Sequence, residues 1–153
     1  MIIFRYEVGP AFHDFSCDDS IFRIEITDDK KENVATWFRG KKYIHTLSEM
    51  DLKQVIAVTE KWPELLDIKE LEPNDILDGD EYNFTFSDGV KSNSFCGFNI
   101  RDYSGGSHPK ASIALRAARY IKEMVLDDNN IRTMIPRKLS KRPWHYGSGN
   151  IKI

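Results

Sequence analysis

Residues able to do chemistry are present in this chain, but their spacing defines no catalytic or metal site. No two histidines have the short spacing of a zinc site; the four are His13, His45, His108 and His145. Gly147-Ser148-Gly149 lacks the fuller pattern between a strand and a helix that a hydrolase nucleophile needs. A Cys96–His108 pair would depend on a geometry that spacing does not predict. We therefore expect a non-enzymatic protein with no metal and no cofactor.

A glycine-rich loop at residues 103–107 leads into a predicted helix start. Free backbone N–H groups at a helix N-terminus attract anions, and flanking basic side chains would strengthen that attraction. Neither the phosphate-binding loop nor the dinucleotide fingerprint is present, so a flexible connection is the simpler interpretation. The alternative is an enzyme or ligand-binding domain that holds an anionic small molecule with Arg101, Ser104, Gly105, Gly106, Ser107 and Lys110.

Charge is sorted along the chain, although the formal net charge is only -2. Between Glu60 and Glu81 there are nine acids against two bases. Such a run is typical of a solvated face rather than of a dry pocket that raises a carboxyl pKa. It also suits a docking surface for a basic protein, because opposed potentials speed association. The candidate partner-binding residues are Glu70, Glu72, Asp75, Asp78 and Asp80.

The end of the chain is basic: from Arg132 onward there are six bases and no acid. Bases interleaved with Trp144 and Tyr146 suit single-stranded nucleic acid, but the near-balanced net charge makes a nucleic-acid partner the weaker interpretation. The two aromatics suit packing on the body equally well, with the bases pointing outward. A third interpretation is a homo-oligomer in which the basic tail meets the acidic segment of another copy.

The elements that would position these residues begin with strands. Apolar and polar residues alternate with a period of two, and turn residues separate the runs. The pattern predicts an antiparallel meander of four strands over residues 2–8, 22–26, 34–39 and 43–47.

Two helices are predicted from capping signals and apolar spacing. The first begins after Ser48, with Asp51 at the capping-box position, and ends near Pro63, after which one short helical turn is expected. The second begins after Ser107 and stops at residues 127–130. Its expected apolar stripe consists of Ile113, Ala117, Tyr120, Ile121 and Met124.

A hairpin is predicted between the helices. Asp88-Gly89 suits a two-residue type I′ turn, which would pair Phe86 with Lys91 and Phe84 with Asn93. One face of the hairpin is then aromatic and the other polar, so helices are expected on one side only. We expect a single α+β domain over residues 1–153. Its antiparallel sheet joins the N-terminal meander to the central hairpin, two main helices pack on one face, and residues 131–153 form an extended basic tail.

The stretch from Leu77 to Gly89, continuing to Gly97-Phe98-Asn99, resembles small uncharacterised bacterial α+β proteins. The shared layout is Asp-Gly, an aromatic, an alternating strand, a second Asp-Gly, a strand and Gly-x-Asn. Small α+β proteins with an acidic patch also resemble toxin-immunity proteins, including those of contact-dependent inhibition. That resemblance implies a non-enzymatic inhibitor that neutralises a bacterial toxin by occluding a basic toxin domain. The basic tail departs from the strongly acidic balance of many nuclease-neutralising members.

Features of export and membrane insertion are missing from the sequence. No stretch approaches the roughly 20 apolar residues of a membrane span, and the first residues lack a signal-peptide pattern. Two cysteines without an export signal, Cys17 and Cys96, are usually reduced. We therefore expect a cytoplasmic protein with no membrane contact.

Overall fold

The computed structural model describes residues 1–10, 22–38, 41–71, 80–100, 108–127, 145–146 and 151–152. Within them, six strands form one antiparallel sheet in the order β4-β3-β2-β1-β5-β6. The strands are β1 (Ile2–Pro10), β2 (Phe22–Thr27), β3 (Val34–Phe38), β4 (Lys41–His45), β5 (Asp80–Ser87) and β6 (Ser92–Phe98). The helices are α1 (Glu49–Lys61), the 3-10 helix η1 (Pro63–Leu66) and α2 (Pro109–Asp127). The predicted α+β architecture, a meander joined to a hairpin, is confirmed.

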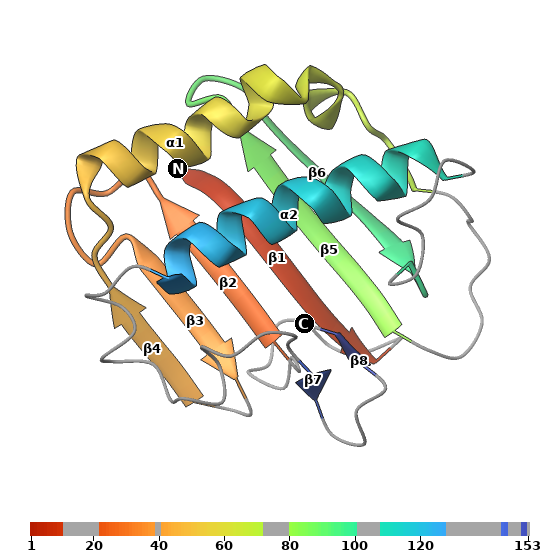
Figure 1. Cartoon of the computed structure of the whole chain (residues 1–153), viewed down its shortest axis with the longest axis horizontal. Coiled ribbons are helices and arrows are strands. Elements are labelled where there is room, and N and C mark those ends of the chain that lie inside the picture. Colours follow the sequence, from red (N-terminus) through yellow and green to blue (C-terminus); the bar gives the residue numbers. More distant parts are fainter. Residues whose placement is uncertain are drawn as a thin grey trace.

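Both α-helices cross the same face of the sheet (Figure 1). Strand alternation explains this placement, because every second residue of the central strands is apolar and fully buried beneath the helices. The aromatic rings there form a continuous layer, with Tyr6, Phe84, Phe86 and Phe95 in contact across three strands. The predicted one-sided packing is therefore confirmed.

The start of α1 follows the predicted capping pattern. The Ser48 hydroxyl oxygen accepts a hydrogen bond from the Asp51 backbone N–H at 3.1 Å, and the Ser48 hydroxyl lies 2.8 Å from the Asp51 carboxylate. The helix ends at Lys61, and Pro63 begins η1, which is the short helical turn that was expected. The cap and the proline together fix where α1 begins and ends.

The apolar stripe of α2 differs from the predicted one. Tyr120 is 45% exposed, so its place in the predicted stripe was wrong. The side chains that face the sheet are mostly small: Ala111, Ala114, Ala117, Ala118, Ile121 and Val125. Alanines let the helix backbone approach a layer of aromatic rings that already fills the space, whereas a tyrosine on that side would overpack it.

The register of the hairpin is two residues away from the prediction. Phe84 pairs with Phe95 and Phe86 with Asn93, and the loop spans four residues rather than two. The cause is the Asp88 carboxylate, which accepts hydrogen bonds from the backbone N–H groups of Val90 (2.8 Å) and Lys91 (2.7 Å). A shift of two residues preserves which face each side chain occupies, so the predicted aromatic face is confirmed although the pairing was wrong.

Most of the predicted basic tail, residues 131–153, lies outside the described residues. Within it, β7 (His145–Tyr146) and β8 (Ile151–Lys152) pair antiparallel as a separate two-stranded ladder. Among the described residues, no helix is long and apolar enough to cross a membrane.

Candidate functional site

The described part of the acidic segment is an ordered structure with two different sides. Glu64, Asp67 and Glu70 recur every three residues and are exposed, and we call them the acidic row. The residues that follow each of them are buried in the core: Leu65, Ile68 and Leu71. Glu64 and Leu65 lie in η1, where three residues complete a turn, and the same spacing of three continues in the residues that follow, up to Leu71.

Hydrogen bonds attach this segment to the sheet. The Asn93 amide of β6 donates to the backbone carbonyls of Leu65 (2.9 Å) and Ile68 (2.8 Å). Gly97 permits the close approach, because a Cβ atom there would lie 2.9 Å from the Leu71 side chain. The acidic row therefore stands on a rigid support, which lowers the entropy lost when a partner binds.

The predicted partner-binding residues divide between described and undescribed parts of the chain. Glu70 is exposed and belongs to the acidic row. Asp80 is half-buried at the start of β5, where its backbone N–H donates to the Asn99 side-chain oxygen at 2.9 Å. The other three, Glu72, Asp75 and Asp78, lie outside the described residues. The structure adds Glu64 and Asp67, which the sequence-based choice left out.

An apolar residue lies beside the acidic row at the tip of the β5–β6 hairpin. Val90 is 91% exposed. Its neighbour Lys91 forms an exposed ion pair of 2.8 Å with Asp67, so the hairpin tip and the acidic row are adjacent. An apolar side chain next to charged groups is the usual arrangement of an anchor within a polar rim.

The alternative anion site is largely undescribed. Arg101, Ser104, Gly105, Gly106 and Ser107 all lie outside the described residues. Lys110 is exposed in the first turn of α2. The hypothesis of an anionic small molecule at this loop therefore remains a prediction.

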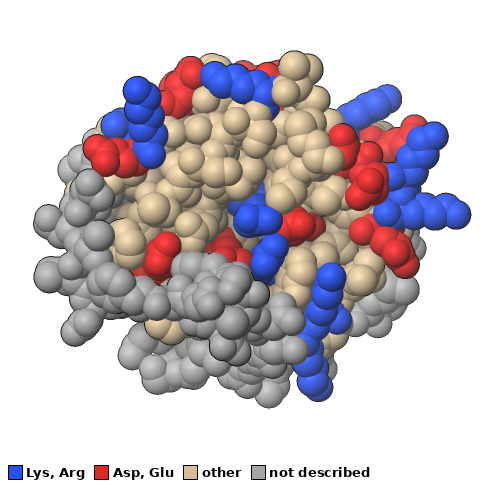
Figure 2. All heavy atoms as spheres, turned by 180° about the vertical axis from the view of Figure 1, so that it is seen from behind, with Lys and Arg blue, Asp and Glu red and all other residues tan. Residues whose placement is uncertain are grey.

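The face of the sheet opposite the helices carries charges at its centre (Figure 2). The Glu25 carboxylate accepts hydrogen bonds from Arg5 (2.8 Å) and Arg23 (2.7 Å), and Arg23 Nε lies 3.2 Å from Glu7. Burial alone would raise the pKa of Glu25, but the hydrogen bonds from the two arginines outweigh it and lower that pKa. Two arginines and two glutamates cancel in charge, so this ladder is a structural network.

Trp37 extends the ladder toward the edge of the sheet. The Arg23 guanidinium lies 4.4 Å from the Trp37 ring centroid, and the Lys42 ammonium lies 4.9 Å from it. Both distances fit cation–π contacts. Sequence alternation predicted that this face is polar, but the contacts join strands β1 to β4 and depend on register.

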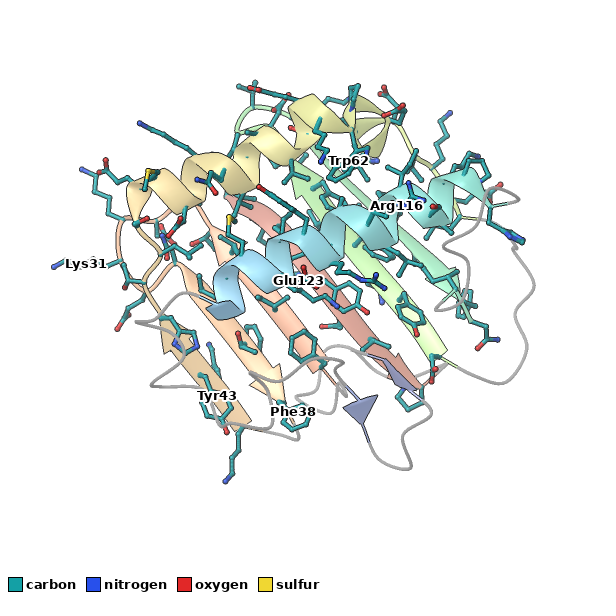
Figure 3. All side chains as sticks on the ribbon, viewed as in Figure 1. Lys31, Phe38, Tyr43, Trp62, Arg116 and Glu123 are labelled. Atoms are coloured by element: carbon teal, nitrogen blue, oxygen red, sulfur yellow. The ribbon has the colours of Figure 1, made fainter. Side chains whose placement is uncertain are left out.

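A second set of polar residues lies near the β4 edge of the sheet, where His45 pairs with Val34 and Thr36 pairs with the half-buried Tyr43. Figure 3 labels Tyr43 at this edge. His45 is 4% exposed, and neither ring nitrogen has a hydrogen-bond partner among the described residues. The buried hydroxyl of Thr36 has none there either. Burial lowers the pKa of His45 because it penalises the charged imidazolium.

Lys122 of α2 occupies the most unusual environment of any described charged group. It is half-buried, and its Nζ lies 4.2 Å from the ring centroid of Tyr6. Burial, and next the charge of Arg119, lowers the pKa of Lys122 to about 7, with Glu123 acting in the opposite direction. A shift of one pKa unit corresponds to about 1.36 kcal/mol, and a cation–π contact contributes about 0.5–2 kcal/mol. The contact with the Tyr6 ring therefore offsets only part of the lowering of the Lys122 pKa.

Sequence reasoning missed Lys122 because helical periodicity places it off the apolar stripe. Its long side chain reaches from the edge of α2 to the sheet, where Tyr6 of β1 lies. The only signal in the sequence was a lysine beside Ile121 on a helix that covers an aromatic sheet face.

Metal and thiol chemistry have few candidates. The described residues hold no group of three histidine, cysteine, aspartate or glutamate side chains able to bind a metal ion. Cys96 is an exposed free thiol on β6, and partial burial, followed by the nearby Glu81, raises the pKa of that thiol. A raised pKa leaves less of the reactive thiolate at neutral pH. Cys17 lies outside the described residues.

No protein-family model, no curated protein and no solved structure matches this chain in the comparisons with known proteins.

Proposed function

We propose that this protein is a non-enzymatic binding protein that docks a basic protein partner through the acidic row and Val90. The observation that carries the proposal is the alternation from Glu64 to Leu71, in which exposed carboxylates stand on buried leucine and isoleucine anchors. A charge run that served only solubility would not need this support, because loose acids solvate a surface equally well.

The partner class follows from the chemistry of this surface. Exposed carboxylates attract a lysine- and arginine-rich surface and speed its approach. Val90 offers an apolar group that is desolvated on contact. We further propose that the partner is a bacterial toxin domain and that the protein acts as an immunity-type inhibitor that occludes it in the cytoplasm.

The first test compares three forms of the protein as bait for proteins of a bacterial lysate. The acidic-row variant combines Glu64→Gln, Asp67→Asn and Glu70→Gln. The control variant combines Asp29→Asn, Glu32→Gln and Glu49→Gln, which are exposed acids around the far end of α1 and carry the same change in charge. Neutralising exposed charges that contribute about 0.3–1 kcal/mol each predicts an affinity loss of roughly tenfold, mainly in the association rate.

A captured protein is then produced in cells with each form of the chain, and growth is measured. We expect the partner to be basic, to be toxic when produced alone, and to be neutralised by the wild type and the control variant. The acidic-row variant should protect less well, and Val90→Ser should protect less well without loss of thermal stability. A partner whose capture is indifferent to the acidic-row substitutions and to salt would overturn the proposal.

A further inference from the structure

A half-buried lysine at the edge of α2 reaches an aromatic ring of the sheet. Lys122 follows the buried Ile121, and its Nζ lies 4.2 Å from the Tyr6 ring centroid on β1. The Tyr6 and Tyr82 rings are 6.3 Å apart, and both side chains are buried. Among the described residues, no ion pair joins the Lys122 ammonium to a carboxylate. The amine therefore has an aromatic surface beneath it and no anionic partner there.

The titratable and charged groups around this amine and around its neighbour Tyr6 come from three elements. The tyrosines belong to β1 and β5, Asp80 begins β5, and Arg119 and Glu123 flank Lys122 on α2. Burial raises the pKa of Tyr6, so its hydroxyl stays protonated at neutral pH. With its pKa lowered to about 7, the Lys122 amine is substantially neutral at a pH where ordinary lysines are almost entirely protonated.

Desolvation beside a second cation is the arrangement that activates a lysine as a nucleophile. Arg119 precedes Lys122 by three residues, which places both on one side of the helix. Arg119 is exposed and its guanidinium stays charged, so it can hold an anion from solvent. A ligand suited to both groups carries a carbonyl carbon for the amine and an anion for the guanidinium.

We propose that Lys122 is a covalent binding site for small anionic carbonyl compounds, with Arg119 contacting the anionic group. The Nζ lone pair attacks the carbonyl carbon and the C=O π bond breaks. The nitrogen loses one proton and the carbonyl oxygen takes one up, which gives a carbinolamine. Loss of water forms the imine, so no oxidant or reductant is required. This site is distinct from the acidic row and goes beyond the proposed docking function.

The test traps the imine on the wild-type protein with glyoxylate and cyanoborohydride, and maps the modified lysines by mass spectrometry. Lys53 of α1 and Lys110 of α2 are exposed and serve as internal references. At pH 7 and limiting glyoxylate we expect Lys122 to react at least about tenfold faster than either, because its neutral fraction is far larger. Its rate should level off above about pH 8, while the reference rates continue to rise toward pH 10.

Two comparisons separate this proposal from general lysine reactivity. Arg119→Gln should reduce labelling by glyoxylate more than labelling by acetaldehyde, which carries no anion. Lys122→Arg should abolish the fast-reacting site while the reference lysines react as before. The proposal is overturned if Lys122 in the wild type reacts no faster than Lys110, or if its rate keeps rising through pH 9.

Discussion

Single buried polar groups account for the pH sensitivity expected of this protein. His45 and Thr36 place unsatisfied polar atoms beneath the helices, and each such atom costs about 1–3 kcal/mol relative to a satisfied one. On the opposite face the Glu25 carboxylate accepts hydrogen bonds from Arg5 and Arg23. Of His45 and Thr36 only His45 titrates, so it carries a pH-dependent cost in mild acid. On the open face the lowered pKa of Glu25 makes a further contribution to stability, which is lost at lower pH.

His45 should make the fold less stable in mild acid. The unfolded chain takes up the imidazole proton near the ordinary pKa of 6.5, whereas the folded chain takes it up only at lower pH. The unfolding free energy should therefore be complete above about pH 6.5 and fall as the pH drops through the lower folded pKa. Urea titrations at pH 5.5 and 7.5 measure this loss, and His45→Leu should reduce it. An equal loss in the two proteins would show that another group is responsible.

At the scale of elements, the junction of η1, β6 and the loop after β6 positions the acidic row. Gly97 lies against Leu71 and Ile100, and Asn99 adopts a left-handed conformation with φ of 52°. The Asn99 side-chain oxygen accepts the Asp80 backbone N–H, which ties the end of β6 to the start of β5. The Gly-x-Asn pattern in the sequence thus has a physical reason: Gly97 allows Leu71 to approach β6 closely, and Asn99 adopts the left-handed conformation that turns the chain.

Gly97→Ala should loosen the acidic row. The added Cβ atom would lie 2.9 Å from Leu71 Cδ1 and 3.1 Å from Ile100, so the segment carrying Leu71 must shift. Overpacking of this kind costs about 1–3 kcal/mol. Thermal unfolding should show the loss of stability, and amide exchange should show reduced protection at residues 65–71. Cys96→Ala on the exposed face of the same strand is the control, and an unshifted exchange pattern in Gly97→Ala would contradict this role.

Most elements and their buried faces could be predicted from the sequence. Apolar residues recur every two residues in a strand and every 3.6 in a helix, and both patterns depend only on residues close together in the chain. The four-strand meander, the Ser48 cap and the aromatic hairpin face all followed from such patterns. The hairpin register did not, because it depends on which backbone groups the Asp88 carboxylate binds. The Lys122 site did not either, because Tyr6 and Lys122 lie far apart in the sequence and meet only when α2 packs on β1.

At the scale of the whole molecule, the charges group differently from their order in the sequence. At the centre of the open sheet face, the charges of two arginines and two glutamates cancel in the arginine–glutamate ladder (Figure 2). Exposed acids lie around the start of α1 and in the acidic row on the β6 side of the fold, and the acidic row has Val90 and Lys91 of the hairpin tip beside it. A basic partner would therefore meet the rim formed by η1 and the hairpin tip rather than the broad sheet face.

The central claim is that the acidic row is the docking surface, and the salt dependence of partner binding tests it most directly. The dissociation constant of the captured partner is measured from low to high ionic strength for the wild type, the acidic-row variant and the control variant. We expect steep and similar weakening by salt for the wild type and the control, and a clearly shallower slope with weaker low-salt binding for the acidic-row variant. Equal slopes and equal affinities in all three proteins would contradict the claim.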